Sequence, residues 1–194
     1  MSLRKRVAGV DFSGAREAGK NIWIAEGDIT PSGVKIKMIT RAADLPGGAN
    51  AFEAAIPALV VRVATLTDHI IGCDFPFGLP VDLLSHNTWA SFARSFAADY
   101  TNPDQFRDNC RLKSGGRELK RATDTEARVP WCAYNLRLYR QTWAGIRHFL
   151  YPLINEHNAR VIPMQKPLAG KPLIAEICPA STLSVTPRRT SWSP

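Results

Sequence analysis

The sequence predicts a single α/β domain built on a mixed sheet, and three observations support this fold class. Short apolar segments at residues 7–11, 69–74 and 172–179 have the length and composition of buried strands. Two further strand-like segments, 21–29 and 34–39, follow the first one and are separated by a Thr-Pro-Ser-Gly turn. Segments with helical periodicity separate the later strands, which is the arrangement that returns a chain to pair in parallel.

The first half of the chain gives an antiparallel meander followed by a helix. Residues 34–39 alternate apolar and polar side chains, as expected of a half-exposed strand. Apolar residues at helical spacing predict a helix over residues 51–66. Asn50 and Glu53 resemble a capping box at its start, and Pro57 is expected to kink the helix or to delay its beginning.

Residues of about 82–150 are expected to form a helical and loop-rich insertion before the last strand. We expect helices over 85–100 and 131–150 and loops over 101–130, where no period is evident. The second helix should carry an apolar stripe made of Leu136, Tyr139, Trp143, Ile146 and Leu150. The order β-β-β-α-β-(insertion)-β gives a five-stranded mixed sheet in one domain over residues 1–183, followed by an irregular tail over 184–194.

Composition points to an ordinary globular protein of 194 residues, with 45% hydrophobic and 22% charged residues. No apolar run approaches the roughly 18–20 residues that span a bilayer, and the N-terminus lacks the apolar core of a signal peptide. We therefore expect a cytoplasmic protein without a membrane partner. The four cysteines include no CxxC pair and have no histidine at zinc-ligand spacing, so we expect reduced and mostly buried thiols.

Three of the short strands each carry one acid, namely Asp11, Asp74 and Glu176. If these strands are parallel neighbours about 5 Å apart, the three carboxylates meet at one edge of the sheet. Each acid alone has a structural explanation, a turn for the two aspartates and an arginine partner for the glutamate. Their repetition on three strands favours an active centre, because clustered carboxylates repel one another unless cations compensate them.

Oxygen ligands of this kind suit Mg²⁺ or Mn²⁺, so Asp11, Asp74 and Glu176 are candidate metal ligands and catalytic residues. Two such ions about 3.5–4 Å apart activate a water and stabilise the leaving oxygen in phosphodiester cleavage.

Positive charge is concentrated between residues 107 and 147. This stretch contains ten Lys and Arg and four Asp and Glu, in a chain of net charge +8. Such asymmetry favours a partner rich in phosphate, and a solvated basic face is the alternative. Trp131 and Tyr134 are candidates for stacking on bases, with core packing as the alternative. Ser13 lies in the turn after Asp11 and is a further phosphate-binding candidate. The basic candidates for phosphate contacts are Arg111, Lys113, Arg117, Lys120, Arg121, Arg128, Arg137 and Arg140.

Three segments of the chain resemble the signature segments of the domain of unknown function 429 family. They are GVDFSGA at 9–15, IGCDFPFGLP at 71–80 and AEICPAST at 175–182, of which the second is the most specific. The resemblance spans the chain up to about residue 183. It implies a ribonuclease H-like fold, a predicted and largely uncharacterised nuclease role, and a sheet order with the first strand beside the fourth and the fourth beside the fifth.

The same resemblance places Asp11, Asp74 and Glu176 on the acidic positions of the family. One departure concerns the usual fourth acid from a late helix in ribonuclease H-like enzymes, because no acid follows Glu176 here.

The leading hypothesis is therefore a metal-dependent nuclease acting on DNA or RNA. A non-catalytic nucleic-acid-binding module is the first alternative, in which the acids are structural. A phosphoryl-transfer enzyme of the actin and sugar-kinase kind is the second, although 194 residues are too few for its two domains. The sequence leaves the substrate and the oligomeric state open.

Overall fold

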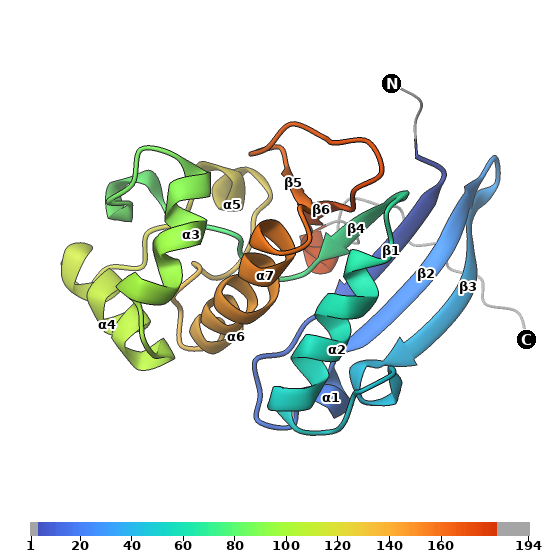
Figure 1. The fold of residues 1–194 in the computed structure, drawn as a ribbon. Coiled ribbons are helices and arrows are strands. Elements are labelled where there is room, and N and C mark those ends of the chain that lie inside the picture. Colours follow the sequence, from blue (N-terminus) through green and yellow to red (C-terminus); the bar gives the residue numbers. More distant parts are fainter. Residues whose placement is uncertain (1–3, 182–194) are drawn as a thin grey trace, which may run out of the picture.

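A computed structural model describes residues 4–181 of the chain and contains one six-stranded mixed sheet with the order β3-β2-β1-β4-β6-β5 (Figure 1). Strands β1, β2 and β3 form the expected antiparallel meander, whereas β1, β4, β6 and β5 run parallel. The strands are β1 (Arg6–Asp11), β2 (Trp23–Thr30), β3 (Gly33–Arg41), β4 (His69–Cys73), β5 (Arg160–Ile162) and β6 (Leu173–Glu176).

The α/β class, the mixed sheet and the neighbourhoods of β1 with β4 and of β4 with β6 are confirmed. The predicted number of five strands is wrong, because β5 forms the parallel edge beside β6. This strand has three residues and is too short to show a strand period in the sequence.

Helix α2 (Phe52–Ala64) follows the meander and buries Ile56, Leu59 and Val63 against the sheet. Its N-cap residue is Ala51, and no side chain caps the helix, so the expected capping box is wrong. The helix begins at Phe52 and continues through Pro57. Three shorter elements are α1 (Ala18–Asn21), η1 (Ala42–Asp44) and η2 (Val81–Leu83).

The insertion is more helical than the sequence indicated. The segment 101–130, expected to be loops, contains α4 (Pro103–Lys113) and α5 (Ala122–Glu126). Helix α4 begins at an Asn102 side-chain cap with proline in its first turn, a start signal present in the sequence. Helix α3 (Trp89–Asp99) begins four residues later than expected, at a capping box formed by Thr88 and Ser91.

The last long helix has three parts, α6 (Tyr139–Ala144), the π-helical η3 (Gly145–Leu150) and α7 (Tyr151–Asn155). It begins eight residues later than expected. Leu136 therefore lies outside it and is 65% exposed, which corrects its place in the apolar stripe. Tyr139, Ile146 and Leu150 are buried as expected.

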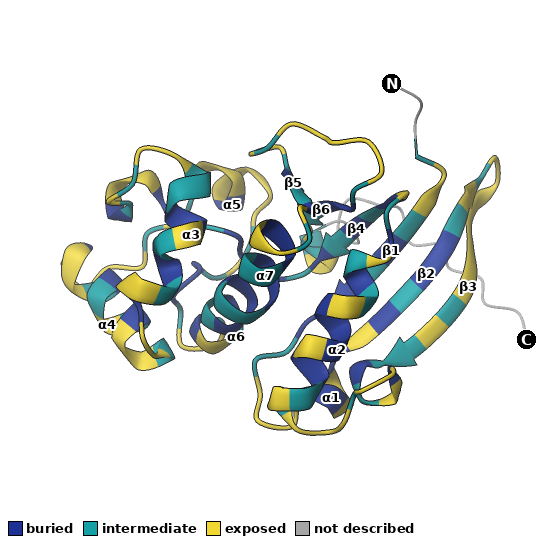
Figure 2. Ribbon diagram, viewed as in Figure 1, coloured by how far each residue is buried: buried dark blue, intermediate teal, exposed yellow. Residues whose placement is uncertain are grey.

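The hydrophobic core lies between one face of the sheet and the helices α1, α2, α6, η3 and α7, which cover that face alone (Figures 1 and 2). Cys73, Cys110 and Cys132 are buried and Cys178 is half-buried, which agrees with the expectation for the thiols. Within residues 4–181, no helix has the length and apolar character needed to cross a membrane. The expected tail, 184–194, lies outside the described residues.

Candidate active site

Asp11 and Asp74 meet at the carboxyl ends of the central parallel strands β1 and β4. The register pairs Val10 of β1 with Cys73 of β4, and the next residues along the two strands are Asp11 and Asp74. The backbone N–H of Phe12 donates a hydrogen bond of 2.7 Å to Oδ1 of Asp74. The side chain of Asp74 therefore reaches across to the turn that leaves Asp11, as the sequence predicted.

The pKa of Asp74 is raised to about 7. Burial is the main cause, and the negative charge of Asp11 and a hydrogen bond with that carboxyl add to it. The hydrogen bond from Phe12 acts in the opposite direction by favouring the ionised form. Among residues 4–181, no basic side chain forms an ion pair with either of these carboxyl groups, and the pair is stabilised by either a proton or a cation.

Helix α6 holds both acid-bearing turns in place through Gln141. Its Nε2 donates to the backbone oxygen of Phe12 at 2.8 Å and to that of Asp74 at 3.1 Å. Gly14 lies against the same helix, since a Cβ atom there would stand only 2.7 Å from the backbone oxygen of Arg140. Gln141 was missed in the sequence because an isolated glutamine in an amphipathic helix gives no signal of its partners.

Glu176 stands at the same edge of the sheet but points toward a different face. It pairs with Cys73, whose side chain is fully buried on the helix-covered face. Because side chains alternate along a strand, Glu176 points toward the helical insertion and Asp11, one residue beyond Val10, points away from it. Glu176 Oε2 accepts hydrogen bonds from the backbone N–H of Phe77 at 2.8 Å and from Nη1 of Arg121 at 2.7 Å.

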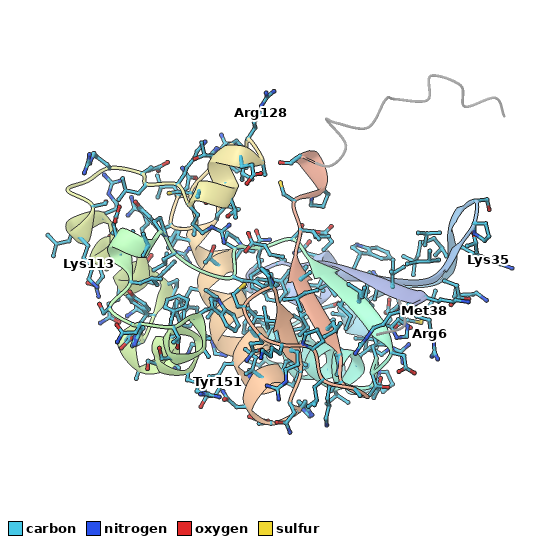
Figure 3. All side chains as sticks on the ribbon, turned by 90° about the horizontal axis from the view of Figure 1, so that it is seen from above. Arg6, Lys35, Met38, Lys113, Arg128 and Tyr151 are labelled. Carbon is cyan, nitrogen blue, oxygen red and sulfur yellow. The ribbon has the colours of Figure 1, made fainter. Side chains whose placement is uncertain are left out.

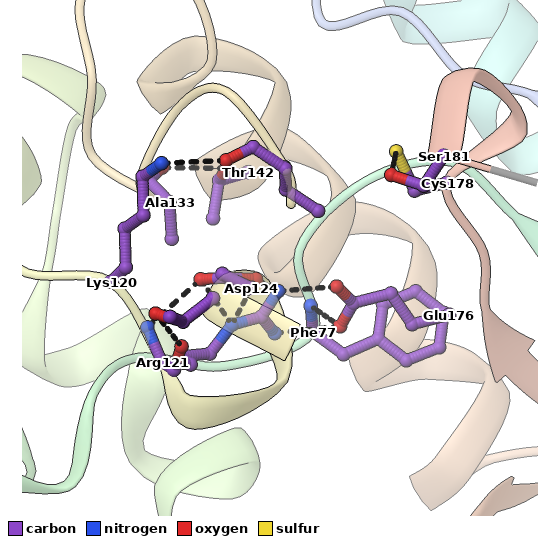
Figure 4. A network of polar contacts seen from close by, with 11 residues as sticks. Phe77, Lys120, Arg121, Asp124, Ala133, Thr142, Glu176, Cys178 and Ser181 are labelled. Carbon is purple, nitrogen blue, oxygen red and sulfur yellow. Dashed lines mark hydrogen bonds and ion pairs between the residues drawn. The ribbon is translucent and has the colours of Figure 1, made fainter. Parts of the chain in front are cut away.

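Arg121 neutralises two carboxylates at once (Figure 4). Its Nη2 contacts Oε1 of Glu176, and its Nε lies 3.0 Å from Oδ2 of Asp124. Asp124 is only 3% exposed. Burial alone would lower the pKa of Arg121, but the hydrogen bonds with Glu176 and Asp124 outweigh burial and raise it. The arginine takes the place that the sequence analysis gave to a metal ion beside Glu176.

Two hollows flank the ion pair of Arg121 and Glu176. One has a volume of about 330 Å³, with Asp74, Trp131 and Leu138 in its wall. The other has about 380 Å³ and reaches Trp89 and Met164. Each lies at the lower end of the roughly 300–1,000 Å³ of ligand pockets.

The donor set fits one divalent ion rather than two. Asp11 and Asp74 supply two adjacent carboxylates, and Mg²⁺ is commonly held by one or two carboxylates together with waters and substrate oxygens. Glu176 is occupied by Arg121. Among residues 4–181, no group of three or more His, Cys, Asp and Glu side chains is arranged to hold a metal ion. The expected set of three acidic ligands is thus not assembled in this arrangement.

Some of the predicted phosphate-binding residues surround the first hollow. The Lys120 ammonium donates to the backbone oxygen of Val129 at 2.7 Å, and the Arg137 guanidinium lies 5.0 Å from the ring centroid of Trp131. Val129 and Trp131 both line this hollow, and the exposed Arg128 directly precedes Val129. Arg121 thus lines the hollow that contains Asp74, and Lys120, Arg128 and Arg137 adjoin residues that line it.

The other candidates lie elsewhere or have structural partners. Arg111 and Lys113 are on α4, and the Lys113 ammonium donates to Ser85 Oγ at 2.9 Å. Figure 3 shows Lys113 apart from Arg128. Arg117 donates to the Ser114 backbone oxygen, and Arg140 donates to the Tyr139 hydroxyl.

The turn residue Ser13 and the ring of Tyr134 also have local structural roles. Ser13 Oγ accepts from the Ala15 N–H at 3.3 Å, as in a local turn. Tyr134 is 1% exposed, so its ring belongs to the core and does not stack on bases.

Comparison with known proteins returned no match, neither to a family model nor to a curated protein or a solved structure. The resemblance to the domain of unknown function 429 family therefore stays a prediction.

Proposed function

We propose that this protein is a divalent-metal-dependent phosphodiesterase that cleaves nucleic acid, built on a ribonuclease H-like sheet of the domain of unknown function 429 kind. The observation that carries the proposal is the pair of Asp11 and Asp74. Two carboxyl groups in contact at the carboxyl edge of parallel strands, one with its pKa raised to about 7, form a site that gains most from a bound cation.

In this proposal Asp11 and Asp74 hold one Mg²⁺ or Mn²⁺ ion, which when bound polarises a phosphoryl oxygen and lowers the pKa of a water. Gln141 fixes the two acid-bearing turns so that both carboxylates keep their separation. Lys120, Arg128 and Arg137 contact phosphates along the neighbouring hollow. The half-buried Trp131 offers a ring face to a base.

Nucleic acid is the proposed substrate because the positive charge extends beyond the hollow. The stretch 107–147 carries a net charge of +6 from ten basic and four acidic residues, more than a single small phosphate ester needs. Contacts of this kind track a sugar–phosphate backbone and read no base sequence.

The test is a cleavage assay on single- and double-stranded DNA, RNA and a hybrid duplex, with Mg²⁺, Mn²⁺ or EDTA. We expect metal-dependent cleavage that falls by at least about 100-fold in Asp74→Asn, because a ligand of the ion is lost. Asp82→Asn is the matched control, since this aspartate is exposed on η2 and should keep full activity. Intact substrates with both metals, or an unchanged rate in Asp74→Asn, would disprove the proposal.

A second candidate, a nucleic-acid-binding module without catalysis, is favoured by the ion pair of Arg121 with Glu176. Here an acid expected to bind metal is already neutralised by the protein itself. Binding that is tight, falls steeply with salt and is unchanged by EDTA, together with no cleavage, would support this candidate.

A further inference from the structure

In the described part of the chain, 4–181, one face of the sheet is covered by no helix, and this face is lined by large apolar side chains. These side chains are 40–62% exposed and belong to Trp23, Ile29, Val34, Ile36, Ile39 and Ile177. They include half of the exposed large hydrophobic residues within the described part of the chain. We call this surface the open face.

The strand register places these side chains on the same side of the sheet. Val34 pairs with Ile29, Ile36 with Gly27 and Ile39 with Ala25. Ile36 and Ile39 are three residues apart, and they share a face because a β-bulge between β2 and β3 leaves one extra residue, Lys37, in β3.

Most charged side chains of the same two strands lie on the opposite, helix-side face, whereas Arg41 pairs with Trp23 and lies at one end of the open face. Lys35 pairs with Asp28, one residue from Ile36 and Gly27, and the Lys37 ammonium lies 3.0 Å from an Asp28 carboxylate oxygen. The usual pattern of an antiparallel sheet is reversed here, because polar side chains normally face the solvent. Away from the end where Asp11 and Arg41 flank Trp23, the composition of the open face is therefore that of an interior surface.

The middle of the open face has a shallow trough at Gly9. Across the strands the register aligns Ala25, Gly9, Gly72 and Ala175, with Ile39 at the end of the row. The Ile177 side chain covers Gly72, where a Cβ atom would lie 2.8 Å from it, and so bounds the trough on that side. Among residues 4–181, a Cβ atom at Gly9 would meet nothing within 4 Å, so no contact within this part of the chain requires glycine there. Glycine inside a central strand weakens the strand and often marks the close approach of another backbone or ligand.

The exposed area is large enough for a stable interface. The six exposed side chains correspond to roughly 500–600 Å² of apolar surface, at the upper limit of the largest patch on a typical monomer. Two copies face to face would bury about 1,100 Å² from these side chains, and more from the half-buried residues between them, against the roughly 1,200–2,000 Å² of specific interfaces.

We propose that the open face binds a second copy of this chain, forming a two-fold symmetric dimer in which the two sheets pack face to face. A two-fold interface uses one patch on both subunits and therefore needs a self-complementary surface. The projecting side chain of Ile39 and the trough at Gly9 are complementary in shape. In the proposed dimer, Ile39 of each copy packs over Gly9 of the other. The basic stretch 107–147 belongs to the insertion, away from this face (Figure 1), whereas Asp11 pairs with Trp23 and lies at one end of the open face.

The first test measures the mass of the full chain by sedimentation velocity over a dilution from about 100 µM to about 0.1 µM. We expect a species of twice 21.4 kDa that dissociates on dilution. Ile36→Glu combined with Ile39→Glu should weaken the dimer by at least about 100-fold, because each buried carboxylate lacks a partner.

The matched control places the same charges on the helical side of the molecule, as Val61→Glu combined with Leu112→Glu. These residues are 59% and 82% exposed, and both double variants lower the net charge of the chain equally. Only the open-face variant should dissociate. A wild-type chain that stays monomeric over the whole range, or equal behaviour of the two variants, would overturn the proposal.

Gly9→Val gives a second test, in which loss of the dimer cannot be explained by unfolding of the monomer. Within one chain the new side chain enters open space and favours the strand, so the monomer should gain stability. In the dimer it fills the trough needed by the partner, so dimer dissociation should increase at least about 10-fold. A dimer of unchanged affinity in Gly9→Val would refute the packing proposed here.

Discussion

Two acidic clusters lie at the same edge of the sheet and differ in how their charge is compensated. Asp11 and Asp74 contact one another without a basic partner, and the pKa of Asp74 is raised to about 7. Glu176 and Asp124 share the guanidinium of Arg121, which lies between them. Within the described residues, the first cluster has no basic side chain as a partner, whereas the second has Arg121.

Strand geometry explains the difference. Neighbouring parallel strands bring their ends together, but alternate residues point to opposite faces. Asp11 lies one residue beyond Val10, and Glu176 is level with Cys73, so their side chains leave the sheet on different sides. The cluster without a cation is therefore the better candidate for a ligand site, and the compensated cluster is the better candidate for a structural support.

The largest effect should come from breaking the compensated cluster with Arg121→Ala. This change leaves Glu176 and the buried Asp124 without their cation, so we expect a loss of about 3–5 kcal/mol in the free energy of unfolding. Urea unfolding followed by circular dichroism measures it. Arg41→Ala is the matched control, because the ion pair with Asp44 has the same sequence spacing but is exposed, so its removal should change stability far less. Equal losses in both variants would contradict a structural role for Arg121.

The uncompensated cluster should produce a pH dependence of the opposite kind. The pKa of Asp74 is raised in the folded protein to about 7 from an ordinary 3.8. Between these values the folded chain holds a proton that the unfolded chain has released, so metal-free stability should fall as pH rises from about 4 to about 7. Asp74→Asn should remove this fall, which we expect to be about 5 °C in Tm.

The measurement compares Tm across this pH range in EDTA for the wild type, Asp74→Asn and the control Asp82→Asn. Asp82→Asn should keep the wild-type slope, since this side chain is exposed. Addition of Mg²⁺ above pH 7 should restore stability to the wild type and not to Asp74→Asn. A wild-type slope in Asp74→Asn would show that the proton is held elsewhere.

The sheet could be predicted from the sequence because its strands carry strong local signals. The apolar runs at β1, β4 and β6 and the alternation in β3 are visible in a window of a few residues. Strand β5 and helix α4 were missed for different reasons. Three residues at 160–162 are too few for a period, whereas the Asn102-Pro103 start of α4 was present and was outweighed by the polar composition of 101–130.

The site could be predicted only in part because the sequence does not reveal the partners of long side chains. Asp11 and Asp74 were predicted correctly to lie together, because each comes at the end of an apolar run that is recognisable as a strand. The different direction of Glu176 follows from the register with Cys73, which single strands do not give. Arg121 was expected to bind phosphate, but its partner Glu176 is 55 residues away.

The smallest effect should come from loosening the uncompensated cluster without changing its charge. Gln141→Leu removes the hydrogen bonds of Nε2 with the backbone oxygens of Phe12 and Asp74, and we expect a loss of about 1–2 kcal/mol in the free energy of unfolding. Thr88→Ala is the control of similar size, because it removes the cap of α3 away from the acids.

These two variants separate positioning from stability when the pH experiment is repeated with each. Thr88→Ala should lower Tm uniformly and keep the wild-type fall between pH 4 and pH 7. In Gln141→Leu the turns that carry Asp11 and Asp74 can move apart, which weakens the mutual repulsion of the carboxylates and lowers the pKa of Asp74 toward its ordinary value. The fall should therefore be smaller in Gln141→Leu than in Thr88→Ala. If both variants keep the full fall, Gln141 only stabilises the fold, and the contact between the two acids is set by the strand ends alone.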